Sequence, residues 1–279
     1  MNRFPVSVAG HCPGASGRAW TRRSESKESF NMKIGIIGVG HIGKTLTRRL
    51  SEAGHEVKVA NSRGPETIES DTLASGGRAV TAAEAVVDVD VVILSIPLIR
   101  IPQVAPLIAG VPPGTVVIDT SNYYPARDDR IEDIEAGQVE SLWVAQRLER
   151  PIVKAWNSIG SGSFATKGKP AGSPDRIALP VAADNANDRQ IGMDLVDDTG
   201  FDAFDAGTLA ESWRQQPGAP CYCTDLTRQE LPAALAAADA ARLPKRRDLA
   251  VAAIQERVGD ATTNPDEEYG VRLNRALFM

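Results

Sequence analysis

Hydrophobic and polar positions after residue 31 follow two periods, one typical of strands and one typical of helices. Apolar runs of strand length recur at 32–37, 56–60, 91–96, 115–119, 151–155, 177–182 and 201–204. The run at 91–96 has almost no polar residue, as expected of a strand that is buried on both faces. Between the first two runs, Ile42, Leu46 and Leu50 recur every fourth residue and predict a helix over 41–53. This alternation predicts an α/β fold, a doubly wound parallel sheet with helices on both faces.

The middle of the chain shows the same alternation less regularly. Residues 127–150 predict a helix, whereas 157–175 are rich in Gly, Ser and Pro and predict a loop without periodicity. A helix carrying Ile191, Leu195 and Val196 is expected between the last two strands. Long loops in compact domains are functional or disordered, so 157–175 is a segment of interest.

The C-terminal part departs from the strand–helix alternation. Residues 227–258 are rich in Ala and Leu and predict a helix interrupted by Pro244. The last twenty residues give only a weak signal. We therefore expect one main domain over 32–215 and a short helical extension over 216–279.

Residues 1–31 differ in composition from everything after them. They hold five Lys/Arg against two Glu, with much Ser and Gly and no sustained apolar period. Such a leader has three interpretations: an organelle transit peptide, a disordered tail, or translation from a start codon upstream of Met32. We expect the folded part to begin near Met32.

Composition excludes several kinds of protein. The formal charge of −5 argues against a nucleic-acid surface, and no apolar run approaches the roughly 18 to 20 residues of a membrane span. The three cysteines, Cys12, Cys221 and Cys223, are an odd total, which suits a reducing compartment. They have no matching ligands for a metal site, so no metal is predicted. We expect a soluble cytoplasmic protein that contacts neither nucleic acid nor membrane.

A glycine-rich turn follows the first strand and opens the first helix. Its residues are Gly38, Val39, Gly40, His41, Ile42 and Gly43. In the G-x-G-x-x-G pattern the first glycine permits the tight turn and the second lets the backbone approach a pyrophosphate, while the third allows helix and strand to pack closely. The phosphates would then lie over the positive end of the helix dipole. This setting predicts a Rossmann fold with a dinucleotide site.

The end of the second strand indicates which dinucleotide. An NAD-selective site places Asp or Glu there to accept a hydrogen bond from the ribose 2′-hydroxyl. Here Asn61 and Ser62 are neutral donors, and the planar guanidinium of Arg63 suits a phosphate. The nearest acid, Glu66, comes about a turn later. The sequence therefore favours NADP(H).

Several stretches together resemble the coenzyme F420-dependent NADP reductases and their wider NADP oxidoreductase family, to which the STEAP oxidoreductase domain is related. These stretches are IGIIGVGHIG (34–43), NSRG (61–64), LSIP (94–97), IVKAWNSIG (152–160) and GFDAFDAGTLAES (200–212). The likeness covers roughly 32–215, which it implies is an NADP-binding Rossmann domain. The segments after Asn157 and at 213–226 depart from the F420-linked members, so the acceptor pocket is expected to differ.

The resemblance also implies a nicotinamide site. Ser95, Ile96 and Pro97 would lie beside the nicotinamide ribose, and Ala155 and Asn157 would close the far side of the ring. Independently of the resemblance, Asn122 follows a strand and points to the crevice where α/β sheets bind ligands. The resemblance further implies a homodimer and hydride transfer to a small-molecule acceptor, either F420 or a flavin- or quinone-like compound.

Hydride transfer requires little from a protein beyond positioning and the exclusion of water. No Ser/His/Asp or Cys/His constellation is evident, so no catalytic residue is predicted. Trp156, Tyr123 and Tyr124 are candidates to stack on a flavin-like ring or to lie in the core or at its rim. Two other functions stay open: a non-catalytic NADP sensor, and a β-hydroxyacid dehydrogenase whose lysine would be Lys167 or Lys169.

Overall fold

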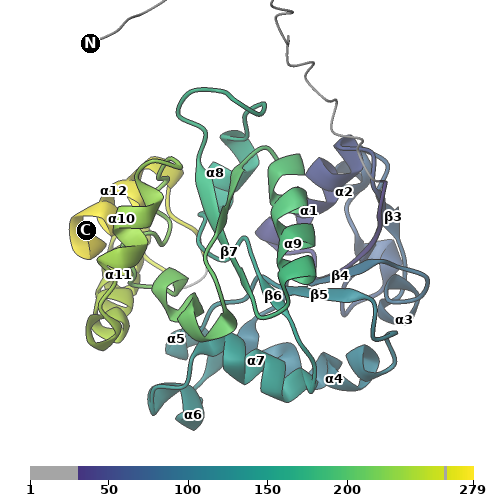
Figure 1. The fold of residues 1–279 in the computed structure, drawn as a ribbon, viewed down its shortest axis with the longest axis horizontal. Coiled ribbons are helices and arrows are strands. Elements are labelled where there is room, and N and C mark those ends of the chain that lie inside the picture. The colour runs from purple at the N-terminus through teal and green to yellow at the C-terminus, as the bar shows by residue number, and fades with distance from the viewer. Residues whose placement is uncertain (1–30, 261–262) are drawn as a thin grey trace, which may run out of the picture. The chain divides into compact units, whose positions relative to one another are not determined.

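The structure is a computed structural model that describes residues 31–260 and 263–279. The expectations for the leader, including Cys12, fall outside the described residues. One sheet of order β3-β2-β1-β4-β5-β6-β7-β8 runs through the described part (Figure 1). Its strands are β1 Lys33–Ile37, β2 Glu56–Ala60, β3 Arg78–Ala79, β4 Val91–Leu94, β5 Val116–Asp119, β6 Val153–Lys154, β7 Ala178–Ala183 and β8 Asp202–Asp205. The first six strands have the 3-2-1-4-5-6 order of the Rossmann fold, so the predicted fold class is confirmed.

The helices surround this sheet and form the C-terminal extension. They are α1 His41–Glu52, α2 Ser70–Leu73, α3 Ala82–Ala85, α4 Ile101–Ala109, α5 Pro125–Asp128, α6 Glu132–Glu135, α7 Glu140–Leu148, α8 Ser161–Thr166, α9 Ala186–Asp198, α10 Leu231–Ala236, α11 Leu243–Val258 and α12 Glu267–Phe278. Short 3₁₀ turns occur at η1 Pro65–Thr67, η2 Leu98–Arg100, η3 Leu209–Gln215 and η4 Ala240–Arg242. None of the helices in the described part combines the length and apolar composition needed to cross a bilayer.

Two apolar layers cover the two faces of the sheet, as alternation along each strand requires. In β4, Val91 and Ile93 face one layer while Val92 and Leu94 face the other. The first layer contains side chains of α1 and α9, and the second contains side chains of α4 and α7. The doubly wound arrangement predicted from the strand pattern is therefore present (Figure 1).

The strand direction was predicted wrongly at one position. β7 pairs antiparallel with β6, with Val153 opposite Ala183, whereas the other adjacent pairs of strands are parallel. A parallel pair needs a crossover that returns the chain to the starting edge of the sheet. The connection between β6 and β7 instead brings the chain back into the sheet from the edge at which β6 ended.

In the middle of the chain, one helix prediction and one loop prediction were also wrong in part. The helix expected over 127–150 is broken into α5, α6 and α7, because Asp129 (φ +56°) and Gly137 (φ +103°) adopt left-handed conformations that end a helix. The loop expected over 157–175 contains α8, which lacks periodicity but buries Phe164 against Phe201 with ring centroids 5.3 Å apart. Tertiary packing stabilises this helix where the local pattern gives no signal.

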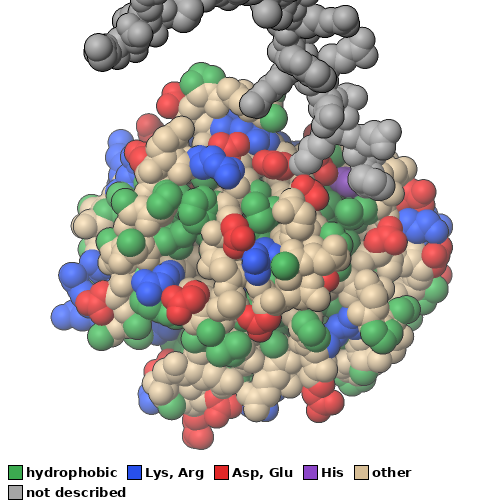
Figure 2. Space-filling model, viewed as in Figure 1, with side chains coloured by type: hydrophobic (Ala, Val, Ile, Leu, Met, Phe, Trp, Pro, Cys, Tyr) green, Lys and Arg blue, Asp and Glu red, His purple; other side chains and the backbone are tan. Residues whose placement is uncertain are grey.

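The C-terminal extension is helical, and the helix predicted over 227–258 is divided into α10, the turn η4 and α11 just before Pro244. Pro244 lies in the first turn of α11, where its missing N–H is harmless, so it does not interrupt that helix. The last twenty residues, where the sequence gave only a weak signal, form α12. Asp266 caps this helix by accepting a hydrogen bond from the Tyr269 amide (2.9 Å). Lys/Arg and Asp/Glu side chains are interspersed on the face shown in Figure 2, without segregation by sign.

Candidate functional site

The glycine turn between β1 and α1 has the geometry that its sequence predicts. Gly38 has φ +111°, and a Cβ at this position would lie 2.1 Å from the Ser95 carbonyl oxygen. A Cβ at Gly43 would lie 2.0 Å from the Gly38 carbonyl oxygen. Both positions therefore exclude any side chain. A Cβ at Gly40 would instead meet no atom within 4 Å, so this part of the backbone lies open to a ligand.

The helix that follows has an N-terminus that no side chain caps. Gly40 is the N-cap of α1 and supplies no side-chain hydrogen bond, and the first turn contains no acidic residue. The backbone N–H groups and the positive end of the helix dipole therefore remain available to an anion. His41 is exposed at this end, whereas Val39 and Ile42 pack partly against the core.

Hydrogen bonds at the carboxyl edge of the sheet hold successive loops together. The Gly38 amide donates to the Ala60 carbonyl (2.8 Å), and the Ser95 amide donates to the Ile37 carbonyl (2.8 Å). The Thr120 amide then donates to the carbonyl of Leu94 (3.1 Å). These bonds bring the glycine turn and the predicted nicotinamide segments to one edge of the sheet, where α/β proteins bind their ligands.

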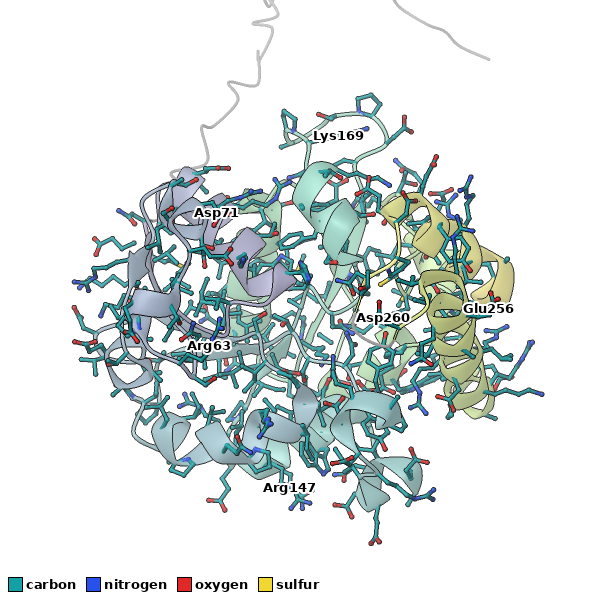
Figure 3. All side chains as sticks on the ribbon, turned by 180° about the vertical axis from the view of Figure 1, so that it is seen from behind. Arg63, Asp71, Arg147, Lys169, Glu256 and Asp260 are labelled. Atoms are coloured by element: carbon teal, nitrogen blue, oxygen red, sulfur yellow. The ribbon has the colours of Figure 1, made fainter. Side chains whose placement is uncertain are left out.

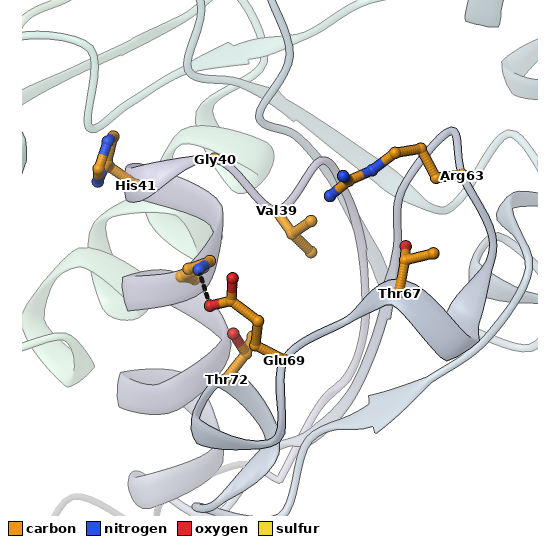
Figure 4. Close-up of a pocket in the computed structure, with 8 residues that line it drawn as sticks. Val39, Gly40, His41, Arg63, Thr67, Glu69 and Thr72 are labelled. Carbon is orange, nitrogen blue, oxygen red and sulfur yellow. Dashed lines mark hydrogen bonds and ion pairs between the residues drawn. The ribbon is translucent and has the colours of Figure 1, made fainter. Parts of the chain in front are cut away.

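A cleft of about 220 Å³ lies between the glycine turn and the loop after β2. It is lined by Val39, Gly40, His41, Lys44, Arg63, Thr67, Glu69 and Thr72. The Arg63 side chain extends into it (Figure 4) and forms no hydrogen bond or ion pair with any residue in the described part of the chain. Figure 3 shows Arg63 on the half of the molecule that carries Asp71 of α2, on the opposite side from Glu256 of α11.

The other two residues predicted beside Arg63 have different surroundings. Asn61 Oδ1 accepts hydrogen bonds from the amides of Arg63 and Gly64, each at 2.9 Å, so it shapes the loop. Asn61 Nδ2 donates to Thr67 Oγ1 at 2.8 Å. Ser62 is exposed and does not line the cleft. Of these three predicted residues, the structure brings Arg63 alone into the cleft.

Three cleft residues had not been predicted. Lys44, one turn into α1, forms an ion pair with Glu69 in the segment before α2 (Figure 4). Thr72 of α2 is buried, and its hydroxyl has no hydrogen-bond partner among the described residues. The position of Lys44 directly after the glycine turn was a usable signal. Nothing in the sequence around Glu69 and Thr72 indicated that they would fold onto the turn.

The residues predicted at the nicotinamide end divide into an open and a covered group. Ser95, Ile96 and Asn122 are partly exposed, and Pro97 is exposed. Ala155 is fully buried within the core.

Asn157, the other residue expected to close the far side of the ring, is covered by η3. Its Nδ2 donates to the carbonyl of Gln215 (2.9 Å), while Gln215 Nε2 donates to Asn157 Oδ1 (2.9 Å). Asn157 Nδ2 also donates to Asn122 Oδ1 (3.0 Å). The Oε1 atom of Gln215 is buried without a hydrogen-bond partner among the described residues. The segment 213–226, which differs from the F420-linked reductases in sequence, thus begins directly over the predicted nicotinamide site.

A buried cluster of charges supports the loop that carries Asn122. Lys154 Nζ lies 2.6 Å from Asp119 Oδ2 and also donates to the Ser121 carbonyl, and both charged side chains are inaccessible to solvent. Glu140 accepts a hydrogen bond from the Tyr123 amide (3.1 Å). Burial raises the pKa of Glu140 to about 7, although the nearby charge of Lys154 opposes this shift. The cluster fixes β5, β6 and the loop between β5 and α5 relative to one another.

The aromatic and sulfur side chains do not form a cofactor stack or a redox centre in this structure. Trp156 and Tyr123 are at most 1% exposed and belong to the core. Cys221 and Cys223 are free thiols, and burial raises the pKa of Cys221 to about 12, which disfavours the reactive thiolate. No group of three metal-ligating side chains occurs among the described residues.

These features fit a dinucleotide with a 2′-phosphate. The open backbone at Gly40 and the uncapped start of α1 suit a pyrophosphate. The unpaired guanidinium of Arg63 and the unpartnered hydroxyl of Thr72 suit an anionic group beside the adenine-side ribose. The cleft volume is below the roughly 300 to 1,000 Å³ of small-molecule sites, so it suits one part of such a cofactor.

Comparison with known proteins relates the N-terminal half of the sheet to one family. Residues 33–123 match the model of the family described as "NADP oxidoreductase coenzyme F420-dependent". The fold and the glycine turn are those of a Rossmann dinucleotide-binding domain, and residues 33–123 of it are similar to this NADP oxidoreductase family. The resemblance expected from the sequence motifs is thereby confirmed over these residues.

A curated relative is similar over a short stretch. The Escherichia coli (strain K12) protein YjhV is 54% identical over 56 residues, which are 20% of this chain and 41% of YjhV. The match thus spans less than half of the length of that relative.

Solved structures share the fold over longer stretches. SMa0349 from Sinorhizobium meliloti superposes with a TM-score of 0.60 and 29% identity, covering 70% of this chain and 95% of that one. A proposed F420-dependent NADP reductase from Arthrobacter sp. FB24 superposes with a TM-score of 0.51 and 16% identity, covering 84% and 98%. Mycobacterium tuberculosis 3-hydroxyisobutyrate dehydrogenase superposes with a TM-score of 0.51 and 19% identity. The match covers 82% of this chain and 66% of that one.

Proposed function

We propose that this chain binds NADPH and passes a hydride to a flavin-, deazaflavin- or quinone-like acceptor. The observation that carries the NADP(H) assignment is Arg63, which lines the cleft after β2 and has no hydrogen-bond or ion-pair partner among the described residues. When bound, the nicotinamide supplies the hydride. The protein positions the cofactor: amides of the glycine turn hold the pyrophosphate, Arg63 binds the 2′-phosphate, and the segment carrying Ser95 and Pro97 supports the nicotinamide ribose.

The acceptor would occupy the carboxyl edge of the sheet near Asn122. Asn122 is partly exposed there and is held by Asn157, which donates to its Oδ1 atom, and by its own bond to the Asn157 carbonyl (2.9 Å). The buried pair of Lys154 and Asp119 keeps this loop rigid. A rigid wall suits a reaction that depends on the placement of two rings rather than on a proton donor.

A second candidate function is that of a non-catalytic NADP sensor, and one specific observation favours it. Ala155 and Asn157, which the family resemblance implies beside the nicotinamide, are covered in this structure, and Gln215 of η3 lies against Asn157. A protein that binds NADP(H) without reacting needs no open acceptor site. The β-hydroxyacid alternative has less support, because Lys167 pairs with Asp225 (3.0 Å) and Lys169 donates to backbone carbonyls.

The test of the cofactor assignment compares Arg63→Ala with wild type for binding of NADPH and NADH. Loss of a phosphate contact costs roughly 1.5 to 3 kcal/mol, so the Kd for NADPH should rise about 10- to 150-fold. The Kd for NADH should stay within about twofold, since it lacks the phosphate. Arg272→Ala, which removes a 70% exposed arginine on α12, serves as the matched control. Equal weakening of both cofactors by Arg63→Ala contradicts the assignment.

The acceptor is tested by turnover. NADPH oxidation is followed with FMN, FAD, a deazaflavin and small quinones, with NADH in parallel. Turnover with one acceptor class supports the enzyme, whereas tight NADPH binding without turnover on this panel favours the sensor. We also propose a homodimer from the family resemblance, to be measured by light scattering coupled to gel filtration.

A further inference from the structure

Lys44 and Arg63 line the same cleft, but only Lys44 is neutralised. Lys44 Nζ is paired with the carboxylate of Glu69, whereas Arg63 has no partner among the described residues (Figure 4). Lys44 belongs to α1 and Glu69 to the segment before α2, so the pair joins the two elements across the cleft. Among the described residues that line the cleft, Arg63 is thus a cation without a partner, and Lys44 is a cation paired with a carboxylate.

The charge of the expected ligand matches both cations together. A phosphate monoester carries about −1.5 to −2 charges at neutral pH, which a single guanidinium does not balance. The ammonium of Lys44 would supply the second positive charge if it left Glu69. That exchange is easy because the pair is exposed, 35% for Lys44 and 65% for Glu69, and exposed ion pairs contribute little stability.

A third group in the cleft also suits a phosphate. Thr72 is 1% exposed and its Oγ1 has no hydrogen-bond partner among the described residues, although a buried hydroxyl ordinarily has one. Figure 4 shows Thr72 beside Glu69, the residue that pairs with Lys44. A phosphate oxygen in place of the Glu69 carboxylate would give this hydroxyl an acceptor.

We infer that Glu69 is a specificity-determining residue that holds Lys44 while the cleft is empty and yields it to the 2′-phosphate of NADP(H). This inference rests on the proposed function, since it presupposes that the cleft takes the 2′-phosphate. Glu69 thereby weakens NADP(H) binding by competition and keeps the cofactor exchangeable. The opposite role for an acid near the end of β2 is to accept a hydrogen bond from the free 2′-hydroxyl of NAD.

Glu69→Gln separates these roles, because it keeps the shape of the side chain and removes its charge. We expect the Kd for NADPH to fall about five- to tenfold, as the competitor and its repulsion of the phosphate disappear. The Kd for NADH should stay within about twofold. Lys44→Met should raise the Kd for NADPH about tenfold. Glu66→Gln, a neighbouring exposed acid that does not line the cleft, is the matched control and should change neither Kd.

The same variants are titrated with adenosine 2′,5′-bisphosphate and with 5′-AMP, which isolate the phosphate from the nicotinamide end. Tighter binding of the bisphosphate alone by Glu69→Gln supports the inference. An unchanged affinity for NADPH, or weaker binding of NADH, overturns it while leaving the NADP(H) assignment intact. If wild type itself prefers NADH, the proposed function fails instead, so the two failures are distinguishable. Unchanged thermal unfolding midpoints verify that each variant is folded.

Discussion

Lys154 is the most completely buried cation in the described part of the chain, and its replacement tests what holds the carboxyl edge of the sheet together. Its Nζ lies 2.6 Å from Asp119 Oδ2, and both side chains are 0% exposed. Lys154→Met fills a similar volume but removes the charge. The Asp119 carboxylate then keeps one hydrogen bond, from the Ser121 amide to Oδ1 (3.1 Å), and the Ser121 carbonyl loses its donor.

Leaving one member of a buried ion pair without its partner costs about 3 to 5 kcal/mol of unfolding free energy. For a protein of this size each kcal/mol lowers the unfolding midpoint by roughly 2 to 4 °C, so we expect a fall of about 6 to 20 °C. The assay is urea and thermal unfolding followed by circular dichroism. Lys33→Met is the matched control, because Lys33 pairs with Asp88 at 2.7 Å with both side chains exposed, 43% and 74%. Its cost should stay below about 1 kcal/mol.

A double variant isolates the pair from other effects of the substitution. Lys154→Met combined with Asp119→Asn removes the buried negative charge, so it should recover a large part of the stability lost by Lys154→Met alone. The reasoning is refuted if Lys154→Met costs no more than Lys33→Met. It is also refuted if the double variant loses the sum of the two single losses.

Two further predictions concern the same edge of the sheet. Burial raises the pKa of Glu140 from 4.5 to about 7, so folding favours its protonated form and this stabilisation is lost as pH rises through about 7. Glu140→Gln should therefore gain stability relative to wild type as pH rises from about 4.5 to 7.5, by up to about 3 kcal/mol in urea titrations, and a pH-independent difference would contradict this. Gly43→Ala places a Cβ 2.0 Å from the Gly38 carbonyl oxygen, so we expect a loss of about 1 to 3 kcal/mol and weaker binding of both NADPH and NADH. Gly114→Ala, where a Cβ meets nothing within 4 Å, should change neither; normal binding by Gly43→Ala would show that the turn can relax.

The part of the site that the sequence predicted well is the part with a local cause. Gly38 and Gly43 are required by contacts within one strand–turn–helix unit, so their spacing alone reports the geometry. Arg63 follows β2 directly, and its place in the cleft follows from the fixed order of strands in this fold. Asn61 does not line the cleft, because its carboxamide oxygen accepts hydrogen bonds within the loop that carries Arg63.

The remaining site residues depend on segments that meet only in the folded chain. Gln215 covers Asn157 from 58 positions away, in a segment whose sequence gives no indication of its target. Glu69 reaches Lys44 across 25 positions because the short elements η1 and α2 turn the chain back toward α1. Neither contact leaves a periodic signal that a sequence can display.

The sequence by itself determined the α/β class, the first strands and helix and the glycine turn, because each arises from side-chain periodicity or from contacts a few residues apart. The tertiary structure alone decided the reversed direction of β7, the break of the 127–150 helix, the cover over Asn157 and the counter-charge on Lys44. These features depend on packing between elements distant in the chain, and such packing overrides local preference wherever a loop can close in more than one way.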